Sequence, residues 1–346
     1  MKIALDSTYR VGADLSGVGV YSREMLDGLA RAHPRDRFAF CYRPHRFLRS
    51  FGERLPPNAG RFLLTETRAP RSADIFHGLN QRLPHARMRG AVTTFHDLFV
   101  LTGEYSTPEF RRRFGEQARD AAARSDRIIA VSHFTARQAI NVLGVDQAKV
   151  RVVHHGVRPA GGTAAAREKV ILHVGAIQRR KNIARLVDAF DKVDGDWQLV
   201  LAGSAGYGAA EIASRIDAAR SRERIRVLGY LPRAELADWY ARAKIFAFPS
   251  LDEGFGMPVL EAMAAGTPVI ASNRAAIPEV AGNAAWLVDP EDTEELAGAI
   301  VALTQDAERR AELSRRGLKQ AAKFTWAEAI EKTWQVYLEL ARGGPD

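Results

Sequence analysis

The sequence lacks the features that mark a membrane span, a disulfide-stabilised fold or a cysteine-based metal site. Cys41 is the single cysteine, which excludes an internal disulfide and a cysteine cluster. No apolar run reaches the roughly 18 residues that a membrane-spanning helix requires, and low-complexity tracts are missing. The first residues read as a strand without the layout of a secretory signal. We therefore expect a soluble protein in the reducing environment of the cytoplasm.

Nucleic acid is not an expected partner either. The pI of 9.8 is the only feature that favours it, and no recognisable nucleic-acid motif accompanies that value. The net charge of +9 is unevenly distributed: residues 1–166 carry 26 Lys and Arg against 15 Asp and Glu, whereas residues 167–346 carry 24 against 26. The basic first half is either an ordinary solvated surface or a face that binds anionic lipid or a phosphate-bearing acceptor.

One segment of the basic half favours binding to lipid. In "RPHRFLRSFGERL", the apolar residues Phe47, Leu48 and Phe51 recur at helical spacing. Four arginines surround them, at positions 43, 46, 49 and 54. This pattern fits a helix that lies on a membrane surface, although packing of the aromatic rings into a core explains it equally well.

The chain is long enough for two domains of about 150 residues each. Strand-like apolar runs alternate with helical patterns, as in "KIALDST" followed by "VYSREMLDGLARA", and the alternation restarts at "KVILHVGAI". This rhythm is typical of parallel sheets covered by helices. Residues 158–168, "RPAGGTAAARE", lack large apolar side chains and are interpreted as the linker. The predicted fold is α/β, with two Rossmann-like doubly wound domains that face a cleft.

Open parallel sheets bind ligands beyond the carboxyl ends of their strands, so we expect ligand-binding residues in the loops that follow strands. The stretch "FPSLDEGFGMPVLEAMAAG" follows a strand, turns through Gly254 and Gly256, and enters a helix near Pro258. Free N–H groups at a helix start suit a diphosphate, and glycines allow its close approach. Glu253 and Glu261 are about two helical turns apart, so we expect them to hold different parts of one ligand.

A second loop of this kind is basic. "GAIQRRKNIARL" supplies Arg180 and Lys181 just before a helix, a combination that suits phosphate, although an ordinary basic surface loop would look the same. "VDGDWQLV" contains Asp194 and Asp196 in the D-x-D spacing of some metal-dependent sugar transferases. Because this D-x-D includes a glycine and precedes a strand, we interpret it as a turn.

Two loops of the first half also carry unusual residues. "FHDL" has His96 and Asp97 at a strand end, where a cleft residue is expected, although a lone histidine is more often structural. Gly17 and Gly19 follow the first strand and precede a helix, but they do not complete the G-x-G-x-x-G fingerprint of dinucleotide-binding proteins.

Together these segments resemble the retaining glycosyltransferases of family 4, which have the GT-B fold. The most specific match is "EGFGMPVLE", the family motif of two glutamates separated by seven residues, and it is joined by "RRKN", "FHDL", "AVSHFT" and "LGYLP". Within the family the sequence is most similar to bacterial O-antigen mannosyltransferases, through "FHDL…RRRF" and "GTPVIASN…IPEVAG". The resemblance covers nearly the whole chain. It implies an acceptor-binding domain at residues 1–160, a nucleotide-sugar-binding domain at residues 168–324, and a C-terminal helix within residues 325–346 that crosses back to the first domain.

The resemblance also implies roles for individual residues. Glu253 would contact hydroxyls of the donor sugar, and His96 and Asp97 would lie beside the transferred sugar as the other catalytic residues. Glu261 would bind the ribose of the donor. The remaining implied donor-binding residues are two cations for the diphosphate and a set of loop and helix residues: Arg180, Lys181, Gly17, Gly19, Tyr230, Leu231, Gly254, Phe255, Gly256, Met257, Val259 and Leu260.

The implied reaction is transfer of a hexose with retention of configuration, from GDP-mannose to a glycan or a polyprenyl-diphosphate-linked acceptor at the inner membrane face. The same motif would also serve other donors, namely dTDP-rhamnose, UDP-glucose, UDP-galactose and UDP-GlcNAc.

No metal or other cofactor is expected, because Arg180, Lys181 and the helix start would stabilise the leaving diphosphate. Many members carry an arginine where this sequence has Ala176, and Arg180 is the cation that could compensate. A sugar-nucleotide epimerase and a degenerate glycan-binding protein would share the fold, and the intact motif argues against both.

Overall fold

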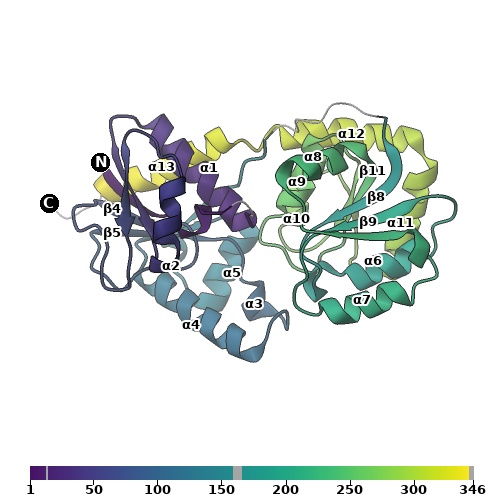
Figure 1. The fold of residues 1–346 in the computed structure, drawn as a ribbon, viewed down its shortest axis with the longest axis horizontal. Helices are drawn as coiled ribbons and strands as arrows, with labels where there is room; N and C mark the ends of the chain where they lie inside the picture. Colours follow the sequence, from purple (N-terminus) through teal and green to yellow (C-terminus); the bar gives the residue numbers. More distant parts are fainter. Residues whose placement is uncertain (13–14, 159–165, 343–346) are drawn as a thin grey trace. The chain divides into compact units, whose positions relative to one another are not determined.

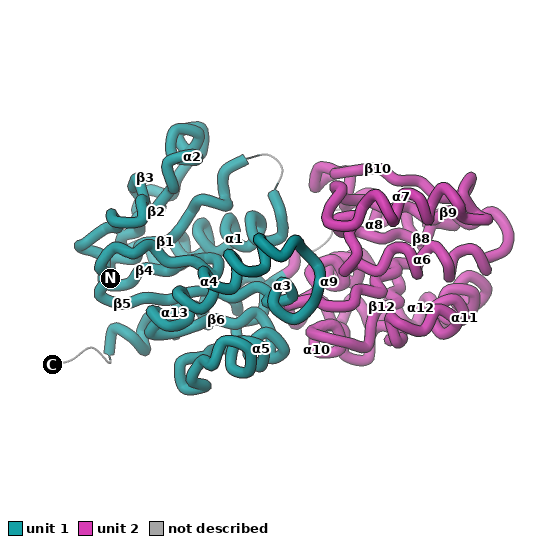
Figure 2. The backbone as a smooth tube through the Cα atoms, turned by 90° about the horizontal axis from the view of Figure 1, so that it is seen from below, with its two compact units in different colours: residues 1–156, 325–346 teal, residues 157–324 magenta. Residues whose placement is uncertain are grey.

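The computed structural model describes residues 1–12, 15–158 and 166–342, and the chain divides into two compact units. Unit 1 comprises residues 1–156 and 325–346, and unit 2 comprises residues 157–324 (Figure 1, Figure 2). Most of the predicted linker at residues 158–168 lies outside the described residues, as does the predicted domain end at residue 160. Among the described residues, no helix combines the length and the apolar character needed to cross a membrane.

The described part of unit 1 is built around a seven-stranded sheet with the order β3-β2-β1-β4-β5-β6-β7. All neighbouring strands in it are parallel. Ile3, Ala4 and Leu5 of β1 are all buried, because both faces of a parallel sheet are covered. The strands are β1 (Lys2–Asp6), β2 (Arg37–Tyr42), β3 (Ala59–Leu63), β4 (Ile75–Gly78), β5 (Gly90–Phe95), β6 (Arg127–Ala130) and β7 (Val150–Val152).

The C-terminal helix belongs to unit 1, where α13 packs against α1 (Figure 1). Ile330 of α13 lies so close to Gly28 of α1 that a Cβ at position 28 would clash with Ile330 Cδ1. The predicted return of the chain to the first domain is therefore confirmed. The described helices of unit 1 are α1 (Gly17–Ala32), α2 (Pro44–Phe47), α3 (Phe99–Thr102), α4 (Pro108–Arg124), α5 (His133–Leu143) and α13 (Trp326–Arg342), with short 3-10 turns η1 (Thr8–Arg10), η2 (Leu48–Gly52) and η3 (Gln147–Lys149).

The described part of unit 2 has a six-stranded parallel sheet with the order β10-β9-β8-β11-β12-β13. Its strands are β8 (Glu168–Val174), β9 (Gln198–Ala202), β10 (Ile225–Gly229), β11 (Ala243–Phe248), β12 (Val269–Ser272) and β13 (Trp286–Val288). The described helices are α6 (Ile183–Phe190), α7 (Ala209–Asp217), α8 (Arg233–Arg242), α9 (Met257–Ala264), α10 (Ile277–Ala281), α11 (Thr293–Gln305) and α12 (Ala307–Ala321), with 3-10 turns η4 (Arg179–Lys181) and η5 (Arg222–Arg224). The alternation predicted from the second half of the sequence is thus confirmed.

Each sheet reverses its strand order at one position. In unit 1 this topological switch point lies between β1 and β4, and in unit 2 it lies between β8 and β11. The connections on the two sides of such a point leave the sheet in opposite directions, which opens a crevice outside the carboxyl ends of the strands where ligands bind. The doubly wound architecture therefore defines one place in each unit where a functional site is expected.

The sequence patterns did not predict β3. This strand, "AGRFL", pairs with β2 at the edge of the sheet, and its residues are half-buried or exposed. An edge strand contributes little to the core, so it lacks the continuous apolar run that reveals the central strands of a parallel sheet.

Candidate active site

The switch point of unit 2 holds a cluster of two cations and one carboxylate. Arg180 and Lys181 follow β8, Glu253 follows β11, and their side chains are only 8 to 10% exposed. Lys181 Nζ lies 2.5 Å from Glu253 Oε1, and Arg180 Nη1 lies 3.0 Å from the same oxygen. The Arg180 guanidinium also donates to the backbone carbonyl of Asp252. The structure thus brings together residues that the sequence predicted from two separate loops.

The third basic residue of the "RRK" loop has different neighbours. Arg179 forms an ion pair with Glu211 at 2.7 Å, and the two side chains are 48% and 68% exposed. Its guanidinium lies 5.8 Å from the ring centroid of Tyr207. Arg179 therefore forms a surface pair outside the buried cluster and provides a natural comparison for it.

Special backbone conformations direct the two cations toward the β11 loop. Gly175 has a φ of 154°, and a Cβ at this position would lie 3.2 Å from Lys181 Cε. Asn182 ends η4 in the left-handed region, with a φ of 58°, and its side-chain amide donates to the carbonyl oxygens of Pro249 and Pro290 at 3.1 and 2.6 Å. The amide of Asn182 therefore ties the loop after β8 to the end of β11.

Electrostatics keep Glu253 ionised despite its burial. Burial alone would raise the pKa of this carboxyl, but the charges of Arg180 and Lys181 outweigh that effect and lower the pKa to about 2. Beneath the cluster, Lys181 Nζ lies 4.7 Å from the ring centroid of Phe248, and His173 stacks on the same ring at 5.6 Å. His173 donates from Nδ1 to the carbonyl of Ala247 at 2.9 Å. The carboxylate is therefore charged and held in one orientation at neutral pH.

Glu261 occupies a separate environment within α9, as the spacing of the motif predicted. The Tyr240 hydroxyl of α8 donates to Glu261 Oε2 at 3.0 Å. Burial raises the pKa of Glu261, while the bond from Tyr240 and the charge of Arg233 act in the opposite direction. The two glutamates of the motif thus differ in neighbours and in the direction in which their pKa values shift, which suits them to different groups of a ligand.

The loop between β11 and α9 is shaped by glycine. Gly256 has a φ of 99° and stands at the N-cap of α9, where a Cβ would meet Ile277 Cδ1 at 2.6 Å. Val259 and Leu260 are fully buried, and the Val259 backbone N–H already donates to the carbonyl oxygen of Gly256 at 3.0 Å, so neither side chain is available to a ligand. The side chain of Phe255 is also buried, 5.9 Å from the Phe324 ring.

The other predicted residues of unit 2 lie at strand and helix ends. Gly254 is buried in the same loop, and Met257 opens α9 in a half-buried position. Tyr230 and Leu231 follow β10, with the Tyr230 side chain 42% exposed. The predicted turn at Asp194 and Asp196 agrees with the structure, where the chain bends at Gly195, with a φ of 81°, and at Asp196 before β9 begins.

His96 lies beyond β5 in unit 1, close to that unit's switch point. Its Nε2 donates to the carbonyl of Leu79 at 2.9 Å. The ring stacks on His155 at 5.3 Å and meets Tyr21 edge-on at 4.7 Å. Burial lowers the pKa of His96 to about 4, although the bond to the Leu79 carbonyl acts against this effect. His96 is therefore neutral at pH 7, and the half-buried Asp97 follows it in the chain.

The two predicted glycines of unit 1 lie in the first turn of α1, after β1. The Ser16 side chain caps this helix by accepting from the Gly19 backbone N–H at 3.3 Å. A Cβ at Gly17 would meet nothing within 4 Å, whereas one at Gly19 would lie 3.0 Å from the carbonyl oxygen of Tyr9. Open space at Gly17 leaves this turn accessible to a ligand.

Sequence reasoning assigned no role to Asn182 or Tyr240. The "RRKN" motif was a signal for Asn182, whose amide and left-handed backbone shape the cation loop. No comparable signal exists for Tyr240, because it lies 21 positions before Glu261 in a helix that reads as an ordinary amphipathic segment.

The chain has two Rossmann-like units, with a buried cation–carboxylate cluster at the switch point of unit 2 and His96 close to the switch point of unit 1. This is the architecture of a GT-B glycosyltransferase. Residues 15–160 match the family described as Glycosyltransferase Family 4, and residues 160–320 match Glycosyl transferases group 1. The chain therefore belongs to the glycosyltransferases that these two descriptions name, and it is a glycosyltransferase enzyme.

Two curated relatives and one solved structure illustrate the similarity. The chain is 29% identical to the O-antigen chain mannosyltransferase B of Escherichia coli, across 97% of this chain and 99% of the relative. It is 33% identical to the D-inositol 3-phosphate glycosyltransferase 1 of Catenulispora acidiphila, across 84% of this chain and 78% of the relative. The fold matches a sucrose-phosphate synthase from Thermosynechococcus elongatus with a TM-score of 0.81 at 22% identity, across 99% of both chains. The predicted resemblance to O-antigen mannosyltransferases is thereby confirmed.

Proposed function

We propose that the protein transfers a hexose from a nucleotide sugar to a glycan or lipid-linked glycan during synthesis of a cell-surface polysaccharide. The observation that carries this proposal is the buried cluster of Arg180, Lys181 and Glu253 at the switch point of unit 2. Mannose from GDP-mannose is the proposed donor, supported by the name of the Escherichia coli relative, O-antigen chain mannosyltransferase B.

The charges of the cluster suit a nucleoside diphosphate leaving group. Two cations face one carboxylate, so the cluster carries a net positive charge next to the positive end of α9. As the bond between sugar and diphosphate breaks, negative charge grows on the phosphate oxygen. Arg180, Lys181 and the positive end of α9 would stabilise that charge without rearrangement. We therefore propose that transfer requires no metal ion.

Glu253 would bind the sugar itself. Both cations contact its Oε1, which leaves Oε2 outside the two ion pairs. An ionised carboxylate oxygen accepts hydrogen bonds from hydroxyl groups, so Oε2 would orient the donor hexose. Glu261, bonded to Tyr240, would accept from the ribose hydroxyls. We propose retention of configuration, with the acceptor attacking the face that the diphosphate leaves and with His96 beside the transferred sugar.

Calorimetry tests the donor assignment. GDP, UDP, dTDP and ADP are titrated into the protein in the presence of EDTA, with Glu261→Ala as the variant control. We expect GDP to bind and Glu261→Ala to lose most of that binding. Binding of another nucleotide would change the donor class, and absence of all binding in EDTA that is restored by Mg²⁺ would contradict the metal-independent mechanism. Transfer that persists in Glu253→Ala would contradict the role of Glu253.

A lipid-facing surface on unit 1 is the second part of the proposal. Leu48 and Phe51 in η2 are 80% and 62% exposed, with exposed Arg49 and Arg54 beside them in the chain. The predicted helix is wrong in detail, because the segment forms the short α2 followed by the 3-10 turn η2. Phe47 packs against the core of unit 1, so the core-packing interpretation holds for Phe47, whereas Leu48 and Phe51 are exposed.

The exposed apolar pair and its arginines suit the headgroup region of an anionic membrane, where an acceptor anchored in lipid would be found. Arg43 does not contribute to this surface, because it is buried and pairs with Asp6 and Glu66. We expect vesicles that contain phosphatidylglycerol to retain the protein at low salt and to release it at high salt. Equal retention by vesicles of neutral phosphatidylcholine would contradict the charge-based part of the proposal.

A further inference from the structure

We propose that the switch point of unit 1 is a second sugar-recognition site, in which Glu66 and Arg82 bind hydroxyl groups of the acceptor glycan. Arg43 serves there as a positioning residue for Glu66. This inference rests on the proposed function, because it assigns the acceptor-binding residues of the same enzyme.

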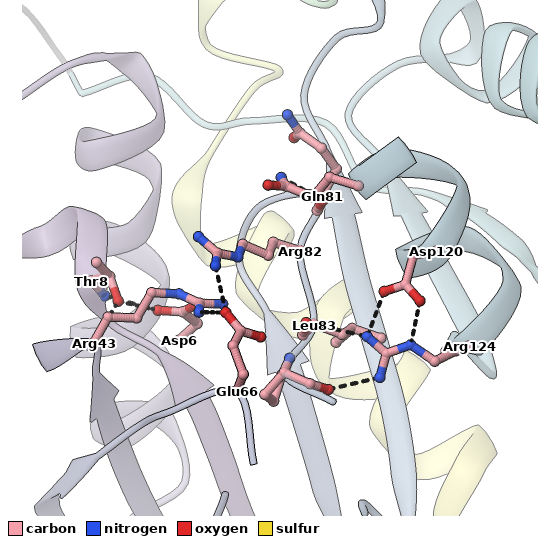
Figure 3. Close-up of polar contacts among 11 residues, drawn as sticks. Asp6, Thr8, Arg43, Glu66, Gln81, Arg82, Leu83, Asp120 and Arg124 are labelled. Atoms are coloured by element: carbon pink, nitrogen blue, oxygen red, sulfur yellow. Dashed lines mark hydrogen bonds and ion pairs between the residues drawn. The ribbon is translucent and has the colours of Figure 1, made fainter. Parts of the chain in front are cut away.

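Two arginines hold the carboxylate of Glu66 (Figure 3). Arg43 Nη1 lies 2.6 Å from Glu66 Oε1, and Arg82 Nη2 lies 2.5 Å from the same oxygen. Burial acts to raise the pKa of Glu66, but Arg43 and Arg82 outweigh it and lower the pKa below its usual range. The second oxygen, Oε2, forms no hydrogen bond with any of the described residues. Glu66 therefore presents one charged, oriented acceptor atom at a side chain that is 42% exposed.

Arg43 is held by contacts with Asp6, at the end of β1, and with Thr8, in the turn that follows. Its Nε lies 3.5 Å from Asp6 Oδ2, and its backbone N–H donates to Thr8 Oγ1 at 3.2 Å. The Thr8 hydroxyl in turn donates to Asp6 Oδ1 at 2.5 Å. Asp6, Thr8 and Arg43 are all at least nine-tenths buried. Figure 3 shows Arg43 in contact with both Asp6 and Glu66, so the buried residues hold Arg43 where it contacts Glu66.

The loop that carries Arg82 is equally well held. Arg124 of α4 donates to the carbonyl oxygens of Pro84 and Leu83 at 2.7 and 3.2 Å, and Asp120 orients Arg124 with an ion pair of 2.7 Å (Figure 3). The loop begins at Leu79, whose carbonyl accepts from His96. A hydrogen bond therefore joins the start of the Arg82 loop to His96, the residue proposed to lie beside the transferred sugar.

A polar atom without a partner supports a ligand at this position. Within the described residues, Arg43 Nη2 is buried and has no hydrogen-bond partner, although Arg43 lies beside Asp6 and Glu66. Buried polar atoms are nearly always paired, and an unpaired one calls for a water, an ion or a ligand.

The balance of charge indicates a neutral polyol. Asp6 and Glu66 offset Arg43 and Arg82, so the cluster has no net charge and gives no preference to a phosphate. Carboxylate acceptors next to guanidinium donors match the alternating donor and acceptor character of sugar hydroxyls. The proposed ligand class is thus a non-ionic sugar unit of the acceptor.

The same arrangement recurs at the switch point of unit 2. There Arg180 and Lys181 hold one oxygen of Glu253, just as Arg43 and Arg82 hold one oxygen of Glu66. Each carboxylate keeps its second oxygen outside the ion pairs and lies beyond the carboxyl ends of parallel strands. Because the geometry that suits Glu253 to a sugar is repeated, a sugar is the consistent ligand for Glu66.

The test compares Glu66→Gln and Arg82→Ala with Glu339→Gln. Glu339 of α13 is a matched control, because Arg127 and Arg151 hold it at 3.2 and 2.8 Å with 37% exposure, and Arg127 opens β6 at the amino end of the sheet. The probes are GDP-mannose as donor and octyl α-D-mannopyranoside as acceptor. Arg82→Ala provides a second variant if Glu66→Gln lowers the thermal midpoint, since Arg82 is partly exposed.

We expect Glu66→Gln and Arg82→Ala to raise the KM for the acceptor by about 10- to 100-fold, the effect of losing a hydrogen bond to a charged group. The Kd for GDP should stay unchanged in both variants, and Glu339→Gln should match the wild type throughout. Equal acceptor KM values in Glu66→Gln and Glu339→Gln would overturn the proposal. So would a loss of GDP binding as large as the rise in KM.

A failure of the proposed function gives a different result. If the wild type neither binds GDP nor transfers mannose, saturation-transfer NMR with methyl α-D-mannopyranoside still tests the site. A signal in the wild type and in Glu339→Gln that is lost in Glu66→Gln supports a sugar site at this switch point. A signal that is the same in all three proteins, or missing from all three, overturns it.

Discussion

Replacing Glu253 by glutamine should destabilise unit 2 strongly and in a pH-dependent way. The substitution keeps the shape of the side chain but removes the charge that faces Arg180 and Lys181, whose side chains are each only 8% exposed. Two neighbouring cations are then left without their shared counter-ion in a poorly hydrated place. Removing one partner of a buried ion pair is among the costly kinds of single substitution, because the remaining charge stays desolvated.

The size of the effect follows from the pKa of Glu253. In the folded protein the pKa is about 2, compared with an ordinary value of 4.5. Each pKa unit corresponds to about 1.4 kcal/mol, so the carboxylate contributes about 3 kcal/mol to the stability of unit 2 at neutral pH. Because the folded pKa is the lower one, this contribution is complete above pH 4.5 and is lost as the pH falls toward 2.

Native-state hydrogen exchange measures this contribution within one unit. The most protected amides of β8 and β11 report the free energy of opening unit 2, and a loss of about 3 kcal/mol accelerates their exchange by roughly 100-fold at pH 7. Peptides from the sheet of unit 1 should be unaffected. Glu211→Gln is the control, since it removes an exposed pair with the adjacent Arg179 and should change stability by about 1 kcal/mol or less.

The acid dependence provides the decisive comparison. Wild-type stability should fall between about pH 4.5 and pH 2 more steeply than that of Glu253→Gln, which has no carboxylate to protonate at this position. Exchange rates at pH 7 that are equal in Glu253→Gln and Glu211→Gln would refute the reasoning. Parallel stability profiles of the wild type and Glu253→Gln through the acid range would also refute it.

Three further outcomes are expected. Glu261→Ala should weaken nucleotide binding by about 10-fold or more in calorimetry, through loss of hydrogen bonds to a ligand, and an unchanged Kd would remove Glu261 from the donor site. Because the pKa of His96 is about 4, His96 stays neutral across physiological pH. The transfer rates of the wild type and of His96→Gln should therefore depend on pH in the same way around pH 6.5, and an inflection there in the wild type alone would contradict the neutral state of His96. Leu48→Ser combined with Phe51→Ser should reduce retention on phosphatidylglycerol vesicles by about 10-fold or more, whereas Leu318→Ser, at a side chain 47% exposed in unit 2, should not.

Most of the fold was predictable because central parallel strands have a strong sequence signal. Runs such as "KVILHV" and "KIFAF" are buried on both faces, and a helix follows each of them after a loop. The short edge strand β3 escaped prediction because only one of its sides pairs with a neighbouring strand. The predicted helix at the "RPHRFLRSFGERL" segment was wrong in detail, since helical spacing over so few residues does not distinguish a full helix from a 3-10 turn.

The candidate site was predictable only in part. Arg180, Lys181 and Glu253 each follow a strand, and parallel strands bring their carboxyl ends to one edge of the sheet. The ion pairs among them depend on the left-handed backbone of Asn182 and on Gly175, and neither is evident from composition. The cluster around Glu66 gave no signal at all. Asp6 ends β1, whereas Arg43, Glu66 and Arg82 lie in three separate loops, and in the sequence each taken alone resembles an ordinary charged residue.

The discontinuous make-up of unit 1 determines when this protein can complete its folding during synthesis. Trp334 stacks on His33 at 3.5 Å, and the Tyr337 hydroxyl lies 2.6 Å from His77 Nδ1, so both pairs join the last helix to segments translated much earlier. The ribosome needs roughly 10 to 30 s to synthesise the intervening stretch from Val157 to Phe324. During that interval the sheet of unit 1 lacks the cover of α13, whereas unit 2 emerges as one uninterrupted segment. Unit 2 can therefore fold first, although its sequence comes second, and the nascent unit 1 exposes apolar surface that a chaperone would bind.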